Sequence, residues 1–147
     1  MSFDISKLTQ ELLDSDGPII HELEMTKKKL EDIKKNVTLI VDDDPTNRMV
    51  LKTLLEMQGS IVKEAENGLI AVEIYKSDRN INLIYMDIMM PVMNGIESTK
   101  QIRKYEKENK LSQVNIIAVT AYSESEKECL SVGIDKVVLK PIQPKDL

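Results

Sequence analysis

The sequence has few of the residues on which extracellular and membrane proteins depend. It contains one cysteine among 147 residues, so no internal disulfide framework can form, which is typical of a reducing compartment. No apolar run approaches the roughly 20 residues that span a bilayer, and no signal-peptide pattern opens the chain. We therefore expect a cytoplasmic protein with no membrane segment.

Aromatic residues and excess positive charge are also scarce. The chain has no tryptophan, one phenylalanine and four tyrosines, and its formal net charge is −5. Nucleic-acid phosphates require clustered Lys and Arg, and the only dense cationic cluster, Lys27–Lys29, stands among glutamates. The tyrosines are too scattered to form a base-stacking surface. The sequence therefore argues against nucleic acid as a direct partner.

What the chain does contain suits one ordinary domain with an appendage, because 41% of its residues are hydrophobic and 31% are charged. In residues 1–36 the apolar residues follow a three-four repeat typical of amphipathic helices. Asp16–Pro18 interrupts the repeat, so we predict helices at about 3–14 and 18–35. Two interpretations are open: the extension covers apolar surface of the domain at 37–147, or it forms a coiled-coil dimer contact.

From residue 37 onward, short apolar runs alternate with helical patterns. The predicted strands are Thr38–Val41, Ser60–Ala65, Leu83–Met86, Asn115–Val119 and Lys136–Leu139. The predicted helices run from Pro45 to about Gln58, from Asn67-Gly68 to about Ser77, from Gly95 to about Glu108, and across Glu124–Val132. Strands that alternate with helices in this way indicate βαβ units, so we predict a three-layer α/β domain with a parallel sheet.

The stretch Ile81–Gly95 organises the rest of this domain. An almost unbroken apolar run leads into Asp87, and Met-Pro and Asn-Gly follow. Such a run is typical of a buried strand, and open α/β sheets place their ligand crevices at the carboxyl ends of strands. Because desolvating a carboxylate costs several kcal/mol, we infer that Asp87 is a reactive group.

Other polar residues fall at the same end of the predicted strands. Asp42–Asp44 follow the first strand, Thr120 follows the fourth and Lys140 follows the fifth. Crowded carboxylates repel one another unless a hard cation joins them, and Mg²⁺ prefers oxygen ligands. Carboxylates, Mg²⁺, a lysine and a hydroxyl together suit phosphoryl transfer. The simpler interpretation of one acid, Asp43 or Asp44, is a cap on the helix that starts at Pro45.

With these motifs in place, the chain resembles the receiver domains of two-component response regulators, and most closely those of hybrid histidine kinases. The resemblance runs from about Val37 to Leu147. It rests on five ordered motifs: Leu39–Asn47, Ala65–Gly68, Met86–Gly95, Ala118–Ala121 and Lys140–Ile142. It implies a doubly wound, flavodoxin-like sheet of five parallel strands in the order 2-1-3-4-5. It also implies a signalling receiver rather than an enzyme.

The resemblance also implies roles for individual residues. Asp87 would be the phosphoacceptor, which takes a phosphoryl group from the phosphohistidine of a histidine kinase or a histidine phosphotransfer protein. Asp42, Asp43 and Asp87 would hold Mg²⁺, together with the backbone carbonyl of Met89.

The remaining implied roles concern the phosphorylated state. Lys140 would pair with the aspartyl phosphate, and the Thr120 hydroxyl would bond a phosphoryl oxygen and so report it. Ala121 would leave room beside the incoming group. The Lys140–Pro141 peptide bond would be cis.

The sequence departs from the family pattern in two places. Receivers often carry a Tyr or Phe three residues before the lysine, and this chain has Val137 there. Receivers also close with a helix after the Lys-Pro strand, whereas this chain reaches Leu147 where that helix should begin. We therefore expect the final helix to be missing. We hypothesise that the helix around Ile19–Ile33, or the copy in a second chain, covers the apolar surface left bare.

Two other functions fit part of the pattern. Asp42-x-Asp44-x-Thr46 matches the signature of haloacid-dehalogenase-like phosphatases, in which Asp42 would be the nucleophile and Asp44 the general acid. That interpretation leaves Asp87 unexplained and lacks an acidic pair after Val119. The second alternative is a binding module that keeps the receiver fold and works without phosphorylation.

Overall fold

The computed structural model describes residues 20–27 and 36–147, which belong to two compact units, Met1–Lys35 and Asn36–Leu147. Residues 20–27 of the first unit form a helix, in which the Thr26 hydroxyl donates to the carbonyl oxygen of Glu22 at 2.9 Å. This agrees with the middle of the helix predicted at 18–35. The helix predicted at 3–14, and both ends of the second helix, lie outside the described residues. The coiled-coil contact stays a prediction.

The second unit is built on a sheet of five parallel strands in the order β2-β1-β3-β4-β5. The strands are β1 Val37–Val41, β2 Ile61–Ala65, β3 Ile81–Asp87, β4 Asn115–Thr120 and β5 Lys136–Leu139. Strand β1 occupies the second position in the sheet. Strand β2 lies on one side of it, and β3, β4 and β5 follow in turn on the other side. The predicted doubly wound order is confirmed.

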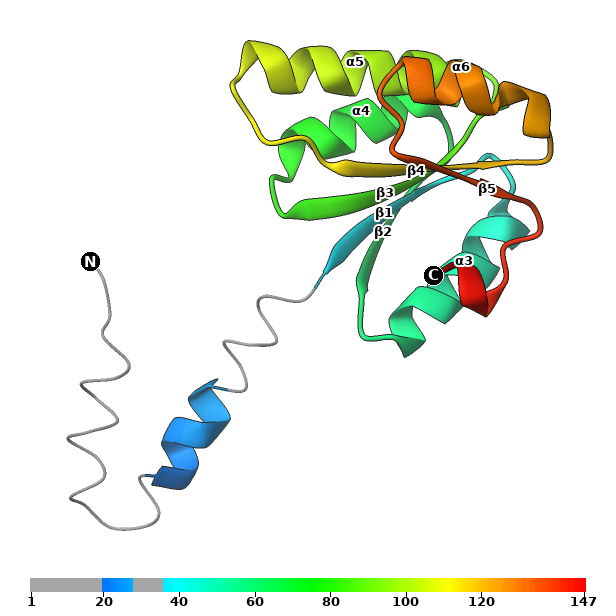
Figure 1. Ribbon diagram of the computed structural model, residues 1–147. Coiled ribbons are helices and arrows are strands. Elements are labelled where there is room, and N and C mark those ends of the chain that lie inside the picture. The colour runs from blue at the N-terminus through cyan, green and yellow to red at the C-terminus, as the bar shows by residue number, and fades with distance from the viewer. Residues whose placement is uncertain (1–19, 28–35) are drawn as a thin grey trace. The chain divides into compact units, whose positions relative to one another are not determined.

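Helices cover both faces of this sheet (Figure 1). The helices are α3 Pro45–Met57, α4 Gly68–Ser77, α5 Gly95–Glu108 and α6 Glu126–Ser131, with single 3-10 turns η1 Ser123–Ser125 and η2 Pro144–Asp146. Figure 1 shows α4, α5 and α6 on one side of the sheet, and α3 with η2 on the other. The three-layer architecture is therefore confirmed.

Side chains and glycines at the helix ends account for where the helices begin and stop. Asp44 caps α3 by accepting a hydrogen bond from the Thr46 amide at 2.8 Å, which settles which acid is the predicted cap. Asn67 and Asn94 cap α4 and α5 in the same way. Gly59 and Gly133 follow α3 and α6 with φ of 89° and 100°, the left-handed conformation that glycine adopts at little cost.

Most predicted bounds agree with the observed ones to within one residue, but two elements begin two residues away from the predicted position. Strand β3 begins at Ile81, not Leu83, because it is central and pairs with β1 from Val37↔Ile81 onward, while Asp87 pairs with Val119 of β4. The helix predicted over Glu124–Val132 is α-helical only at Glu126–Ser131 and follows a 3-10 turn. The Ser125 hydroxyl donates to the Tyr122 carbonyl at 2.8 Å, a local bond that competes with regular helix formation.

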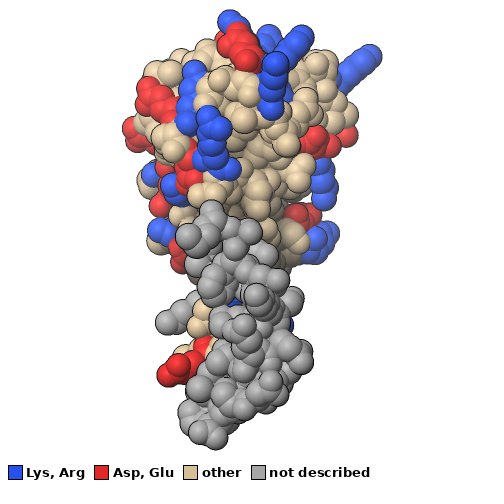
Figure 2. Space-filling view, turned by 90° about the vertical axis from the view of Figure 1, so that its left-hand side faces the viewer, with Lys and Arg blue, Asp and Glu red and all other residues tan. Residues whose placement is uncertain are grey.

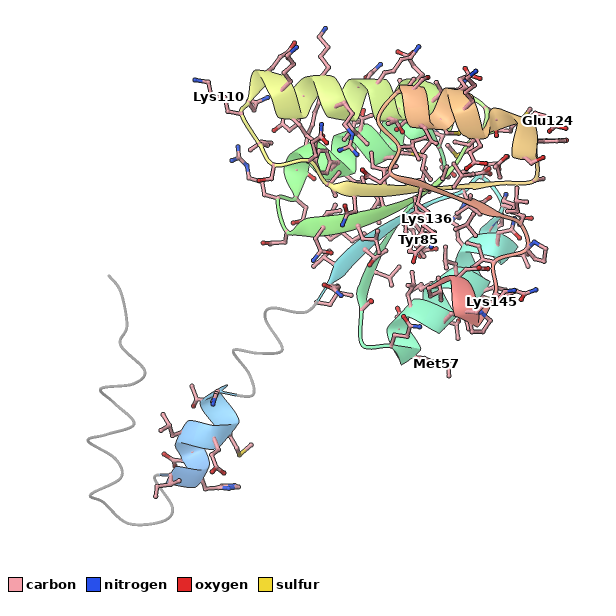
Figure 3. The ribbon with its side chains drawn as sticks, viewed as in Figure 1. Met57, Tyr85, Lys110, Glu124, Lys136 and Lys145 are labelled. Atoms are coloured by element: carbon pink, nitrogen blue, oxygen red, sulfur yellow. The ribbon has the colours of Figure 1, made fainter. Side chains whose placement is uncertain are left out.

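The two faces of the sheet are packed to different extents. The face under α4 and α5 carries the larger apolar core, which includes the fully buried Cys129. On the α3 face a smaller cluster joins Leu51 and Leu55 to Tyr85 and Val119, and Figure 3 shows the Tyr85 side chain on this side of the sheet. Beside this cluster lies a cavity of about 410 Å³.

The segment that follows β5, Lys140–Ile142, lines part of this cavity. After β5 the described chain forms only the η2 turn, and Ile142 and Leu147 pack against the smaller cluster. The expectation that the final helix is missing stays a prediction. Coverage of the α3 face by the N-terminal helix stays a prediction, because the arrangement of the two units is not determined.

The surface of the second unit carries charges of both signs. Figure 2 shows Lys and Arg side chains interspersed with Asp and Glu on the visible face. In the part of the chain that the structure describes, no helix combines the length and the apolar content needed to cross a bilayer.

Candidate functional site

Four of the predicted site residues lie at the carboxyl edge of the sheet. Asp42 directly follows β1, Asp87 is the last residue of β3, Thr120 is the last residue of β4 and Lys140 directly follows β5. The parallel strand order brings these four chain segments together at one edge. This is the placement that the sequence predicts.

The turn between β1 and α3 presents its acids in different environments. Asp42 is buried, and its Oδ1 accepts a hydrogen bond from the Asp44 amide at 2.9 Å. Asp43 is exposed. Asp42, Asp43 and Asp87 each offer one carboxylate oxygen, and these three oxygens lie within 4.8 Å of one another. Asp44 instead points its carboxylate at the start of α3, as its cap.

Lys140 provides the positive charge at the centre of this group. Its Nζ lies 3.2 Å from Oδ2 of Asp87 and 3.3 Å from Oδ2 of Asp42. Its backbone amide donates to the carbonyl oxygen of Thr120 at 2.8 Å, and its peptide bond to Pro141 is cis, as predicted. Burial alone would lower the pKa of Lys140, but the carboxylates of Asp87 and Asp42 outweigh burial and raise it.

The negative charge at the site exceeds what one lysine can balance. Burial, and then repulsion from Asp42, raise the pKa of Asp87, although Lys140 acts in the opposite direction. Asp87 is only 6% exposed, so it is poorly compensated by water. Three convergent carboxylate oxygens with unbalanced negative charge suit a hard divalent cation such as Mg²⁺, which prefers oxygen ligands. The residues present therefore fit the predicted metal.

Thr120 contributes a buried hydroxyl group to the same edge of the sheet. Its hydroxyl oxygen is buried and accepts a hydrogen bond from the Tyr122 amide at 3.1 Å. A hydroxyl can accept and donate at once, so its proton stays available. Ala121 is exposed beside it, and Met89, in the loop after Asp87, is also exposed. Val137 packs partly buried against the larger core.

The loop that follows Asp87 is shaped by close backbone contacts. A Cβ atom at Gly95 would collide with the main-chain carbonyl oxygen of Asp87, so only glycine fits there. The Gly95 amide also donates to the Ile88 carbonyl at 2.9 Å. In the loop between Ile88 and Gly95, Val92 has a φ of 69°, which is an outlier for a β-branched residue.

The sequence motifs did not single out one residue that contacts the site. Arg48, on the first turns of α3, donates from Nη1 to the carbonyl oxygen of Asp42 at 2.7 Å. A cation near a helix N-terminus opposes the helix dipole, so its position was a usable signal. Its partner could not be deduced, because it depends on how α3 packs against the end of β1.

Comparison with known proteins shows which family this chain belongs to. The sequence profile of the response regulator receiver domain matches residues 38–147. The chain belongs to this family. As a receiver domain, it is a signalling module of two-component and phosphorelay systems rather than an enzyme of the usual kind.

Three relatives illustrate the match. Hybrid signal transduction histidine kinase A of Dictyostelium discoideum is 39% identical over 71% of this chain, which spans only 5% of that protein. The receiver domain of the response regulator Ssk1 of Saccharomyces cerevisiae was solved with the histidine phosphotransfer protein Ypd1. It is 36% identical, with a TM-score of 0.70, over 74% of this chain and 81% of that one.

The third relative was solved with a metal ion. The receiver domain of a sensor histidine kinase of Pseudomonas aeruginosa has magnesium coordinated in its active-site cleft. It is 30% identical, with a TM-score of 0.68, over 76% of this chain and 90% of that one. These matches show the fold and the family of the present chain.

Proposed function

We propose that this receiver takes a phosphoryl group from a phosphohistidine onto Asp87 in a Mg²⁺-dependent reaction. The observation that supports this best is the environment of the Asp87 carboxylate. It is buried at the edge of the sheet, 3.2 Å from the Lys140 ammonium, and two further carboxylates converge on it. A carboxylate in this setting can act as a nucleophile while neighbouring cations stabilise the transferred group.

The proposed step is an in-line displacement. A carboxylate oxygen of Asp87 forms a bond to phosphorus as the phosphorus–nitrogen bond of the donor breaks, and the electron pair returns to the imidazole. Asp42, Asp43, Asp87 and the Met89 carbonyl would hold Mg²⁺, which when bound supplies positive charge to the phosphoryl oxygens. Lys140 would remain paired with the new aspartyl phosphate.

The output of the receiver would begin at Thr120 and Lys140. The phosphoryl group adds negative charge at Asp87, which attracts the free hydroxyl proton of Thr120 and the Lys140 ammonium. Both residues end or follow strands β4 and β5, so the surface near these strands is the one we expect to change. Val137 offers no ring that could rotate inward, so the signal would reach a partner protein by another part of this surface.

The phosphorylated state should be long-lived. Met89 lies two residues after Asp87, and its apolar side chain could impede the water that hydrolyses an acyl phosphate. We expect a phosphoryl half-life of minutes or more in the presence of Mg²⁺, and a several-fold shorter one in Met89→Ala. A half-life of seconds in the unaltered protein would contradict this prediction.

The donor would be a histidine kinase or a histidine phosphotransfer protein in the cytoplasm. The complex of the related Ssk1 receiver with Ypd1 supports this class of partner. The N-terminal unit would contribute either a dimer contact or a cover for the α3 face. Because the chain spans a small part of the hybrid kinase that it matches, a longer protein could supply the donor.

Phosphoryl uptake from a small donor tests the proposal directly. We expect one phosphoryl group per chain by intact mass after incubation with acetyl phosphate and Mg²⁺, and none for Asp87→Asn. EDTA should abolish the uptake.

The same experiment separates the alternatives. Continuous hydrolysis of acetyl phosphate, lost in Asp42→Asn, would favour the phosphatase. The cap hydrogen bond of Asp44 already argues against that role, because it occupies the proposed general acid. A chain that takes up no phosphoryl group would favour the binding module that works without phosphorylation.

A further inference from the structure

Arg48 makes one hydrogen bond and one ion pair next to the acidic site. Its Nη1 donates to the main-chain carbonyl oxygen of Asp42 at 2.7 Å, and its Nε lies 3.4 Å from Oε1 of Glu64 on β2. The side chain is only 18% exposed. Two contacts from different atoms of a planar guanidinium fix its orientation more firmly than one contact would.

The hydrogen bond from Arg48 to the Asp42 carbonyl oxygen acts on the peptide unit that joins Asp42 to Asp43. The carbonyl oxygen of Asp42 and the amide of Asp43 belong to the same planar peptide unit. On the other side of Asp42, its own amide donates to the Ala65 carbonyl oxygen at 3.2 Å. The backbone at Asp42 is thus held from both sides, and the plane of the 42–43 peptide sets the directions in which the Asp42 and Asp43 side chains leave the backbone.

Neutralising Glu64 does not explain this arrangement. Lys52, one turn further along α3, already pairs with Oε2 of Glu64 at 3.5 Å. Arg48 lies near the positive end of the α3 dipole, where a second positive charge is unfavourable. The contact that distinguishes Arg48 from Lys52 is its short hydrogen bond to the Asp42 carbonyl.

We propose that Arg48 is a positioning residue for the divalent-cation site, which it serves by fixing the 42–43 peptide. This rests on the proposed function, in which Asp42 and Asp43 bind Mg²⁺. Partners that orient metal ligands typically change metal affinity by about 10–100-fold when they are removed. If the positive charge of Arg48 mattered more than its hydrogen bond, its removal would instead strengthen Mg²⁺ binding.

Calorimetric titration with Mg²⁺ alone, on the full chain, tests this inference. We expect Arg48→Met to weaken Mg²⁺ binding about tenfold or more. Lys52→Met is the matched control, because it loses an ion pair to the same Glu64 without touching Asp42, and its affinity should stay within about twofold. Circular dichroism without Mg²⁺ establishes a temperature at which every variant is folded.

A second variant covers the case in which Arg48→Met does not fold. Arg48→Lys keeps the charge but cannot reproduce the two-pronged geometry, so we expect a several-fold loss of affinity. The inference is overturned if the folded variants at position 48 bind Mg²⁺ as tightly as the unaltered protein or more tightly. It is also overturned if Lys52→Met loses as much affinity.

The outcomes for the unaltered protein separate the two proposals. If it takes up no Mg²⁺, the proposed function fails, and the inference about Arg48 fails with it. If it binds Mg²⁺ and the variants at position 48 bind equally well, only the role of Arg48 is lost.

Discussion

Two buried carboxylates at opposite edges of the sheet differ in how completely their charge is paired. Glu106, near the end of α5, is 2% exposed, and Asp87, at the end of β3, is 6% exposed. Oε2 of Glu106 accepts hydrogen bonds from the Tyr75 hydroxyl at 2.8 Å and the Val114 amide at 2.6 Å. Its Oε1 lies 2.7 Å from Nη1 of Arg103.

The hydrogen-bond network around the Glu106 carboxylate stabilises the fold. Arg103 also donates to the carbonyl oxygen of Gly133, so the network ties α4, α5, the start of β4 and the turn before β5 together. Burial and the bond to Glu106 raise the pKa of Tyr75, which keeps this hydroxyl protonated as a donor.

Asp87, by contrast, has one cationic partner among the described residues, Lys140, which it shares with Asp42. Its pKa is raised, mainly by burial and then by Asp42, because its charge is incompletely compensated. A carboxylate with every bond satisfied holds the fold together, whereas one left short of partners is free to bind a cation or react. Replacing Glu106 should therefore mainly lower the stability of the fold. Replacing Asp87 should mainly abolish phosphoryl uptake.

The largest effect on stability should come from Glu106→Ala. It leaves the Tyr75 hydroxyl, the Val114 amide and Arg103 without a buried partner, so we expect a loss of roughly 3–5 kcal/mol of unfolding free energy. Urea unfolding followed by circular dichroism measures this, because the chain has no tryptophan for fluorescence. Glu108→Ala, on the exposed side of α5, is the control and should cost less than about 1 kcal/mol. Equal losses for both variants would show that the buried network of Glu106 contributes no more to stability than the exposed Glu108.

Mg²⁺ should stabilise the folded protein by binding at the carboxyl edge of the sheet. At about 100 times its dissociation constant, the ion should raise the unfolding free energy by about 2.7 kcal/mol through mass action. Asp43→Asn should reduce this gain strongly, and because Asp43 is exposed and repels Asp87, its replacement should leave the metal-free protein at least as stable as before. Urea titrations with Mg²⁺ and with EDTA give both values. A full gain in Asp43→Asn would exclude Asp43 as a ligand.

The loop beside Asp87 should contain removable strain. Val92 is 78% exposed and has a φ of 69°, a conformation that costs an L-residue about 1–2 kcal/mol. Asn tolerates this conformation, so we expect Val92→Asn to raise the unfolding free energy by about 0.5–1 kcal/mol. Val92→Thr keeps the β-branch and removes the apolar surface. A gain in Val92→Thr as large as in Val92→Asn would show that exposure, not strain, is the cause.

The smallest effect should be that of Asp87→Asn without Mg²⁺. The folded-state pKa of Asp87 is raised, so the folded protein binds this proton more tightly than the unfolded chain does. The cost of ionising Asp87 is absent at low pH and grows as pH rises through the folded pKa. Asp87→Asn should therefore raise the urea midpoint slightly at neutral pH, and the gain should vanish below the ordinary carboxyl range.

The opposite dependence would contradict this account of Asp87. If Asp87→Asn lowered the urea midpoint at neutral pH without Mg²⁺, its pairing with Lys140 would outweigh burial and repulsion. Glu108→Gln, which removes an exposed carboxylate, should change the midpoint little at any pH.

Much of the fold could be predicted because its signals are local. Helix caps such as Asp44 and stops such as Gly59 act within one turn, and short apolar runs reveal strands that are buried on both faces. The acids, Thr120 and Lys140 could be assigned to one site because parallel strands bring their carboxyl ends to one edge. The bounds of β3 and α6 were less predictable, since strand pairing and local serine bonds decide them.

The sequence by itself therefore determined the order of the elements and which residues reach the carboxyl edge of the sheet. Only the tertiary structure decided the partners of the buried charged groups. Glu106 meets a hydroxyl 31 residues away in the chain, and Arg48 finds the Asp42 carbonyl six residues back across a turn. Such contacts depend on how helices pack against the sheet, because a side-chain hydrogen bond requires its two atoms to come within about 3 Å. No periodicity in the chain encodes that distance.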